Sequence, residues 1–246
     1  MAPMDLATTL ATLEAEGTEQ NRKVYARHGA EAPLYGVSFA VLNKLAKKLR
    51  GRHDLALGLW ATGNSDARIL AAMIDDPEQA TSKQLDTWAR EARGYGLVDY
   101  VAALTARSPH AVELAEKWRT AKQEYVARAG WVTLARLALT DTQLPDAWFE
   151  ERLAVLESSV HEQPNRTREG MNHALISFGG RSPGLRKAAL AASKRIGTIH
   201  VDHGETGCKT PPVAPYIEKM WSHATSKGFA TPAEQERGRA GKGCAR

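Results

Sequence analysis

The chain has few cysteines, no long apolar run and almost no strand pattern. Cys208 and Cys244 are its only cysteines among 246 residues, which argues against a disulfide framework and for a reducing compartment. No apolar run approaches the roughly 20 residues that a membrane-spanning helix needs. Residues 1–14 also lack the basic and then apolar order of a signal peptide. These absences predict a soluble, cytoplasmic protein with no membrane partner.

The composition is that of a globular protein with a modest basic excess. Charged residues make up 25% and hydrophobic residues 43% of the chain, and 33 Lys and Arg against 28 Asp and Glu give a net charge of +5. A positive balance suits a polyanion such as nucleic acid, but many proteins without such a partner share it. The class of partner must therefore come from particular residues.

Helical periodicity runs through most of the sequence. Apolar residues recur at three- and four-residue spacing in roughly a dozen segments, and short loops rich in Gly, Pro, Asp and Ser separate them. Ser38 is placed to cap a helix that ends near Leu49, and a long apolar helix is expected over 124–139. The pattern predicts an all-α fold built from helix pairs.

Three of these segments resemble one another. Residues 67–72, 127–132 and 168–175 each carry an Arg at the entry of a helix rich in small residues. Arg128 and Arg168 lie 40 positions apart, which is compatible with helix pairs of roughly 30 to 45 residues stacked in a solenoid. We therefore expect an α-α superhelix of antiparallel pairs with a concave basic groove; an irregular helical bundle is the alternative.

The last part of the chain departs from this pattern. Residues 1–225 are expected to form a single repeat domain, interrupted by a polar loop at 199–212 that carries several Gly and Pro residues. Residues 226–246 lack apolar periodicity and are rich in Lys and Arg, which predicts a disordered basic tail. The expected oligomeric state is a monomer.

Asp99 is the most informative acid in the sequence. In the helix expected over 94–104, Tyr95, Asp99 and Ala103 follow at i, i+4 and i+8 on the face opposite the leucines and valines. Most lone carboxylates on helices are simply solvated. On a surface that binds phosphate, however, a retained acid indicates a need for negative charge. Cleavage of the N-glycosidic bond of a cationic, alkylated nucleotide has that need, because its sugar becomes oxocarbenium-like.

Further candidates lie on the helices expected after Asp99. Arg128, Trp131 and His173 fall on successive inner helices if the solenoid interpretation holds. Arg128 is suited to hold a phosphate. Aromatic rings such as those of Tyr95 and Trp131 can contribute stacking and cation–π contacts of about 0.5–2 kcal/mol each.

A basic helix precedes Asp99. Lys44, Lys47 and Lys48 lie at i, i+3 and i+4, so they share one helical face and are candidates to contact phosphates. An ordinary solvated face opposite the buried leucines is the alternative. The two interpretations differ in whether these lysines contribute to binding.

The polar loop carries a second cluster of reactive side chains. Its candidate metal ligands are His200, Asp202, His203 and Cys208. Such groups at close spacing can bind a divalent metal, but this spacing matches no established zinc signature. The favoured interpretation is a loop held by its own hydrogen bonds, so no metal and no other cofactor is expected.

Several short motifs resemble those of the AlkD-like DNA alkylation repair glycosylases, which are built from HEAT-like helical repeats. The resemblance covers roughly residues 35–196. The motifs are Tyr35-Gly36-Val37, Leu59-Trp60-Ala61, Asp66-Ala67-Arg68, Met73-Ile74-Asp75, Val98-Asp99 and Arg128 between two alanines. The resemblance implies a solenoid of HEAT-like repeats that binds double-stranded DNA containing alkylated purines.

The resemblance also implies roles for particular residues. In that family an Asp preceded by an aromatic residue four positions earlier is the catalytic acid, which corresponds to Asp99 with Tyr95 here. An Arg one repeat later contacts the DNA backbone, which corresponds to Arg128. The chain departs from the family pattern at two positions, since Tyr95 and His173 stand where tryptophans are usual. The family acts without flipping the base into a pocket.

The sequence thus favours a DNA glycosylase that hydrolyses the N-glycosidic bond of cationic N3- and N7-alkylpurines. Tyr95 and His173 would flank the lesion nucleotide and Asp99 would carry the chemistry. Two alternatives stay open. One is a catalytically weak or inactive repeat protein that binds DNA, suggested by the replaced aromatic residues, and the other is a protein-interaction solenoid.

Overall fold

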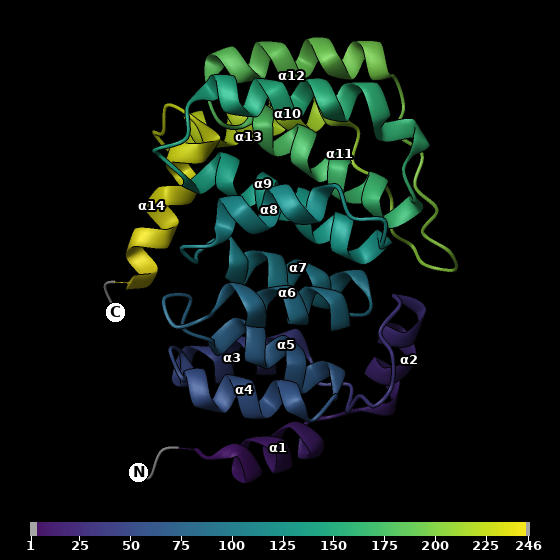
Figure 1. The fold of residues 1–246 in the computed structure, drawn as a ribbon, viewed down its shortest axis with the longest axis vertical. Helices are drawn as coiled ribbons and strands as arrows, with labels where there is room; N and C mark the ends of the chain where they lie inside the picture. Colours follow the sequence, from purple (N-terminus) through teal and green to yellow (C-terminus); the bar gives the residue numbers. More distant parts are fainter. Residues whose placement is uncertain (1–3, 245–246) are drawn as a thin grey trace. The chain divides into compact units, whose positions relative to one another are not determined.

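The structure of the protein, a computed structural model, describes the backbone of residues 4–244 and the side chains of residues 4–239. Within these residues it contains fourteen α-helices, a single 3-10 turn and no strand (Figure 1). The prediction of an all-α fold is therefore confirmed. No helix in the described part of the chain is both long and apolar enough to cross a membrane.

The chain divides into two compact units. Unit 1 comprises residues up to 117 together with 204–206, and unit 2 comprises 118–203 and the residues from 207 onward. Residues 1–225, expected to form a single repeat domain, thus fall into two units, and each is described by itself. Helix α8 (Ala111–Arg119) runs across the boundary between them.

Unit 1 contains the first seven helices. They are α1 (Leu6–Ala15), α2 (Glu19–Arg27), α3 (Phe39–Leu49), α4 (His53–Ala61), α5 (Ser65–Ile74), α6 (Ser82–Glu91) and α7 (Tyr95–Thr105). Helix α5 is central, because it packs against α3, α4 and α7, while α6 packs on α7. The cores of these contacts are leucines such as Leu42, Leu59 and Leu70, all fully buried.

The sequence places the starts of these helices by ordinary capping chemistry. The side chains of Ser38, Asn64 and Thr81 each precede a helix and accept a hydrogen bond from a backbone N–H of its first turn. Such caps satisfy donors that have no partner within the helix. The expected cap at Ser38 is confirmed.

A buried carboxylate connects two motifs of unit 1 that are 30 positions apart in the sequence. Asp66 is 1% exposed and accepts hydrogen bonds from the backbone N–H groups of Tyr35, Gly36 and Val37 at 2.7, 2.9 and 3.1 Å. Three donors compensate the burial of one negative charge. The interaction fixes the segment that leads into α3, and with it the position of Phe39.

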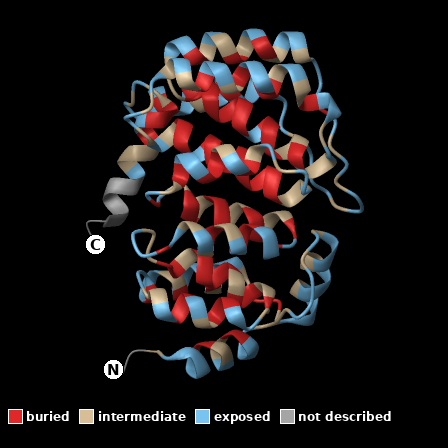
Figure 2. Cartoon of the chain, viewed as in Figure 1, coloured by how far each residue is buried: buried red, intermediate tan, exposed pale blue. Residues whose placement is uncertain are grey.

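Unit 2 is arranged around α9 (Glu124–Thr140), which is buried along most of its length (Figure 2). Its other helices are α10 (Asp146–Ser159), α11 (Asn165–Gly179), α12 (Pro183–Ile196), α13 (Val213–Ser226) and α14 (Pro232–Cys244). Helix α11 packs along α9, and α12 and α13 pack against α11. The two long helices approach closely at Gly170, where an added Cβ would lie 3.3 Å from Arg128.

The prediction of a disordered tail over 226–246 is wrong for the described residues. Residues 232–244 form α14, which packs against α9 and α13. Ala233 is fully buried and its N–H donates to the carbonyl of Gly180 at 3.1 Å. The start of the helix is marked by the Thr231 hydroxyl, which accepts from Glu234 N–H at 3.0 Å. Apolar periodicity alone misses this helix because few of its residues are apolar.

A buried histidine–carboxylate pair lies at the end of α5. The Asp75 side chain is fully buried, and its carboxylate accepts hydrogen bonds from His53 Nδ1 and Gln84 Nε2, both at 2.7 Å. Burial raises the pKa of Asp75 above its ordinary value of 3.8, although the hydrogen bonds from His53 and Gln84 oppose the shift. The folded protein therefore holds the Asp75 proton more strongly than the unfolded chain does.

This shift predicts how stability changes in acid. Between pH 3.8 and the higher folded pKa, the native state binds more protons than the unfolded state, so the contribution of Asp75 to stability falls as pH rises. Asparagine cannot titrate. We expect the unfolding free energy of wild type minus that of Asp75→Asn, measured by urea titration, to become smaller as the pH rises from 3 to 5.5. A difference that grows with pH over this range would contradict the assignment.

Candidate functional site

Helix α7 presents Asp99 on a half-buried face in unit 1. Tyr95, Gly96, Asp99, Tyr100 and Ala103 are all partly exposed, whereas the leucines and valines of the helix are buried. This agrees with the two faces predicted from the spacing. An added Cβ at Gly96 would meet no heavy atom within 4 Å, so the helix surface is open one turn before Asp99.

The start of α7 is fixed against the end of α2. Gly94 has a φ of +76°, and an added Cβ would lie 2.5 Å from the carbonyl oxygen of Gly29, so only glycine fits. The next residue, Tyr95, shares a hydrogen bond between its hydroxyl group and His28 Nδ1, and the two rings pack edge to face with centroids 5.9 Å apart. Tyr95 is therefore held in place by a residue 67 positions earlier.

Aromatic rings from three helices form a row that ends at Tyr100, the residue after Asp99. Tyr100 stacks on Phe39 with centroids 6.0 Å apart and an interplanar angle of 19°, and Phe39 contacts Tyr25 at 5.7 Å. The Tyr25 hydroxyl donates to the carbonyl of Val37 at 2.8 Å, and burial raises its pKa, with Asp66 and Tyr100 adding to the shift. The phenol is thus kept neutral. Phe39 is 39% exposed, so its ring is accessible to a ligand.

A cavity of about 300 Å³ opens between these elements within unit 1. Its walls are largely apolar, with Val24, Leu34 and Ile69 among them. The aromatic rings of Tyr25, Phe39 and Tyr95 also line it, together with His28 and the charged residues Asp66 and Arg93. Pockets of this size accept small planar or aliphatic groups. The cavity therefore lies next to the helix turn that precedes Asp99.

The three predicted lysines of α3 are exposed. Lys44, Lys47 and Lys48 lie on the side of the helix opposite the buried Leu42 and Leu45. They follow Phe39 on the same helix. Unit 1 thus carries accessible positive charge on the element that also supplies a ring of the aromatic row.

Arg128 lies on α9 in unit 2 and is buried, with 4% of its side chain exposed. Its Nη1 donates to Glu169 Oε2 at 2.8 Å, and Arg166 contacts the same oxygen at 3.0 Å. The predicted role of holding a phosphate is not met in this geometry, because the guanidinium is engaged with a carboxylate rather than presented to solvent. The sequence could not show this partner, which lies 41 positions away.

Trp131, predicted to flank or contact the nucleic acid, lies in the core of unit 2. Its side chain is 2% exposed, because α9 is covered on nearly all sides and Trp131 belongs to its core. A ring buried to this extent cannot stack on a base without unfolding its surroundings. Trp131 contributes to packing in unit 2.

His173 is exposed on α11, as a residue that contacts a ligand must be. Together with Arg128 it lines a second cavity, of about 410 Å³, between α9, α11 and α13. The structure therefore brings these two predicted residues to one site within unit 2. Glu169, Asn172 and other residues of α11 share its walls.

The polar loop is held by hydrogen bonds. The Asn165 side chain bridges both backbone polar groups of Asp202 at 2.7 Å each, and His203 Nε2 pairs with the Thr210 hydroxyl at 2.9 Å. Among the described residues no group of three or more His, Cys, Asp or Glu side chains is placed to hold a metal ion. The candidate ligands His200, Asp202, His203 and Cys208 therefore do not converge.

Sequence reasoning missed Tyr25, His28, Phe39 and Tyr100. The first three lie far from Asp99 in the sequence and come near α7 only through tertiary packing, by contacts with Tyr95 and Tyr100 or with each other. Tyr100 alone carried a readable signal, since it follows Asp99 and lies one turn after Gly96 on the open face of α7. These four residues make unit 1 a more aromatic site than the sequence indicated.

Comparisons with known proteins agree with this architecture. The family model described as DNA alkylation repair enzyme matches residues 9–205. Two uncharacterised proteins, Lin0241 of Listeria innocua and Lmo0209 of Listeria monocytogenes, are each 30% identical over 220 residues, covering 87% of this chain and 95% of the relative. Neither of these names states an activity.

A solved structure shares the fold. It is described as a new family of proteins related to the HEAT-like repeat DNA glycosylases with affinity for branched DNA structures. Its TM-score is 0.81 at 29% identity, and the match covers 90% of this chain and 95% of that one. The HEAT-like, all-α character expected from the sequence is confirmed by this likeness. The protein belongs to the family of DNA alkylation repair enzymes.

Proposed function

We propose that the protein is a DNA glycosylase that binds alkylated duplex DNA and hydrolyses the N-glycosidic bond of cationic N3- and N7-alkylpurines. The observation that carries this proposal is the carboxylate of Asp99 on a half-exposed helix face beside Tyr95 and Tyr100. A negative charge flanked by aromatic rings suits a substrate that is itself positively charged. Membership of the alkylation repair family supports the same substrate class.

Each residue has a distinct part in the proposed reaction. As the bond between the anomeric carbon and the alkylated base breaks, its electron pair leaves with the base, which thereby loses its positive charge. The sugar becomes oxocarbenium-like, and the Asp99 carboxylate stabilises that charge and orients the attacking water. Water adds to the anomeric carbon and gives up a proton, which leaves an abasic site. Tyr95 faces the cationic base, less strongly than a tryptophan would.

The test is release of a methylated base from DNA. Duplex DNA containing 7-methylguanine is incubated with equimolar wild-type protein, and free base and abasic-site strand breaks are both scored. We expect release well above the spontaneous rate in a protein-free control. Spontaneous release only, at stoichiometric protein, would refute the glycosylase proposal.

A second candidate function is DNA binding without catalysis. It is favoured by the affinity for branched DNA that is stated for the structural relative, and by Tyr95 and His173 at positions where the family usually has tryptophan. Binding that persists in the absence of base release would support this candidate. A protein-interaction solenoid is the remaining alternative, and absence of any DNA affinity at low salt would favour it.

The lysines of α3 make a quantitative prediction about DNA affinity. The logarithm of the DNA association constant falls linearly with the logarithm of the salt concentration. If Lys44, Lys47 and Lys48 each neutralise one phosphate, replacing all three by Gln should make this negative slope shallower by about 2.7. The measurement is fluorescence anisotropy with undamaged duplex over a salt series. A control with the exposed Lys83, Lys122 and Lys227 changed to Gln has the same charge change. Equal slopes for the two triple variants would assign the α3 lysines to an ordinary solvated face.

The expected setting follows from the substrate. Chromosomal DNA is the source of alkylated purines, so we propose that the protein acts in the cytoplasm on that DNA. We also propose that it works as a monomer and without a cofactor, since the reaction needs only a carboxylate and water.

A further inference from the structure

The apolar cavity of unit 1 lies about one helical turn from the proposed catalytic carboxylate. Tyr95 and Gly96 line it, and Asp99 follows Tyr95 by four residues on the same half-buried face of α7. Four residues of an α-helix rise about 6 Å. The proposed chemistry at Asp99 needs a sugar and a charged purine ring beside the carboxylate, but it does not use the cavity. The cavity is therefore close enough to receive a group attached to that purine.

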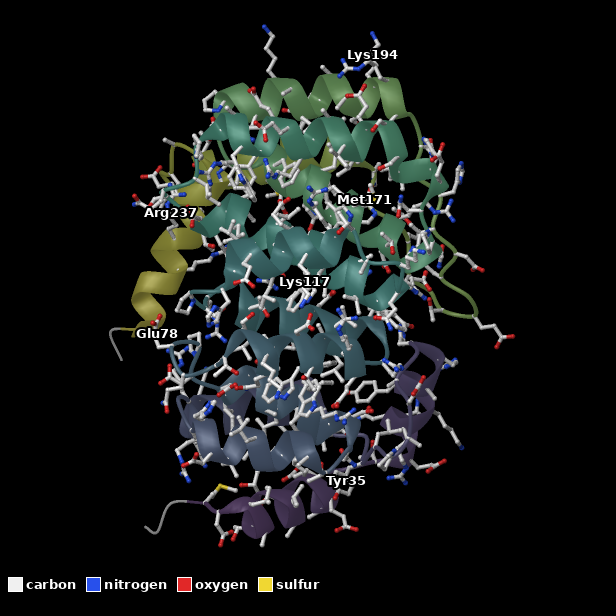
Figure 3. The ribbon with its side chains drawn as sticks, viewed as in Figure 1. Tyr35, Glu78, Lys117, Met171, Lys194 and Arg237 are labelled. Carbon is white, nitrogen blue, oxygen red and sulfur yellow. The ribbon has the colours of Figure 1, made fainter. Side chains whose placement is uncertain are left out.

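The walls of the cavity leave room for a short carbon chain or a single ring. The segment between α2 and α3, in which Tyr35 lies (Figure 3), contributes Ala30 and Leu34. The rings of Tyr25 and Phe39 line it as well, and its volume is about 300 Å³. Apolar surface that enters such a space is removed from water, which favours binding.

The polar groups of the lining are bonded within the protein. The Asp66 carboxylate accepts three backbone N–H groups, and the Ser65 hydroxyl donates to a backbone carbonyl at 2.6 Å. The Tyr95 hydroxyl pairs with His28, and Arg93 Nη1 donates to two backbone carbonyls at 2.8 and 3.0 Å. A polar group that entered would give up its hydrogen bonds to water and meet partners already engaged. The cavity therefore selects apolar groups.

The alkyl group of an N3- or N7-alkylpurine has the position and the chemistry that such a cavity requires. N7 faces the major groove of B-DNA and N3 faces the minor groove. A substituent on either atom thus points away from the base stack while its base remains stacked. The positive charge of the lesion is in the purine ring, and the alkyl substituent is apolar. The lesion therefore has a charged part suited to Asp99 and an apolar part suited to the cavity.

We infer that the cavity of unit 1 is a subsite for the alkyl substituent of the lesion and favours apolar substituents larger than methyl over polar ones. The inference rests on the proposed function, because it takes the lesion nucleotide to lie beside Asp99. The base stays in the duplex, and only its substituent enters the cavity. Burial of each added CH2 group should raise the preference about fourfold until the cavity is filled.

The first arm of the test measures which lesion wild type prefers. Two duplexes of one sequence, containing 7-methylguanine or 7-propylguanine, compete for limiting protein, and the released bases, corrected for spontaneous release, give the ratio of kcat/KM values. We expect 7-propylguanine to be favoured about tenfold or more, since it adds two CH2 groups. 7-(2-Hydroxyethyl)guanine has as many heavy atoms as 7-propylguanine but ends in a hydroxyl group. It should compete no better than 7-methylguanine.

Ala30→Leu narrows the cavity. Ala30 lies in the loop after α2 and is partly exposed, so a larger side chain is compatible with folding. The change should reduce the preference for 7-propylguanine to about twofold or less and leave 7-methylguanine release near the wild-type rate, because a methyl group needs little of the space. Ala26→Leu is the matched control. Ala26 is exposed on α2 and does not line the cavity, so the same added atoms should leave the preference unchanged.

The second arm measures binding without base release. Asp99→Asn retains the cavity, so fluorescence anisotropy should still show tighter binding of the 7-propylguanine duplex than of the 7-methylguanine duplex. Adding Ala30→Leu to this variant should remove the difference. No release of either base by wild type would refute the proposed glycosylase activity, and the binding arm alone would then decide the inference. Equal affinities for the two duplexes, or equal competition by the propyl and hydroxyethyl lesions, would overturn it.

Discussion

Replacing Asp99 by asparagine is expected to lower the rate of 7-methylguanine release by about 100-fold or more. Asparagine keeps the size of the side chain but removes its negative charge, and charge stabilisation at a reacting centre is typically worth two to three orders of magnitude in rate. Because Asp99 is only half-buried on α7, the variant should fold normally. Single-turnover release from duplex DNA at saturating protein measures the chemical step directly.

Asp54→Asn provides the matched control for this result. Asp54 is an exposed helical acid of the same unit, in the first turn of α4, so the same chemical change is made away from the aromatic row. Its rate should equal that of wild type, and DNA affinity should be similar in all three proteins. Equal rates for wild type and Asp99→Asn would show that Asp99 is not catalytic. The all-α HEAT-like fold and the family membership do not depend on this result.

Replacing Asp66 by asparagine is expected to destabilise the protein by about 2–4 kcal/mol. Hydrogen bonds to a charged group contribute about 1.5–3 kcal/mol each and are not additive. The buried carboxylate accepts three backbone N–H groups, on both of its oxygens. In asparagine one of the two carboxylate oxygens is replaced by an NH2 group. This group would face a backbone N–H, and two donors cannot form a hydrogen bond with each other. Urea unfolding followed by circular dichroism measures the loss.

The same variant should also disturb the aromatic row. The segment that Asp66 holds leads directly to Phe39, so its release should loosen the contact between Phe39 and Tyr100. Near-ultraviolet circular dichroism should therefore lose intensity in Asp66→Asn under conditions where the far-ultraviolet signal is intact. Asp54→Asn again serves as the control. A destabilisation below about 1 kcal/mol would mean that the three hydrogen bonds contribute little beyond what water provides.

The helices of this protein could be predicted from the sequence because their determinants are local. Ser38 caps the helix that follows it, and α12 begins with Pro183 directly after the capping side chain of Ser182. The face of α7 that carries Asp99 also follows from spacing alone. These features depend on residues within one or two turns of each other, so one sequence contains all the information needed.

The surroundings of the predicted residues could not be predicted in the same way. Arg128 and Trp131 have sequence contexts that suit nucleic-acid binding, yet Arg128 is paired with Glu169 and Trp131 is in the core. Both outcomes depend on which face of α9 meets α11, and α9 is apolar on nearly all sides, so its periodicity does not mark an outer face. The helix α14 was missed for the opposite reason, because its few apolar residues give no periodicity.

The hydrogen bond between Tyr95 and His28 has a consequence for engineering and for the comparison of relatives. A tryptophan at position 95 would offer only an indole N–H donor, on a ring of different shape, where the phenol oxygen can both donate to and accept from His28 Nδ1. Tyrosine at 95 and histidine at 28 are thus partners in one contact of this chain. A variant with tryptophan at position 95 should therefore be made both with His28 retained and with His28 replaced, and relatives can be compared at both positions.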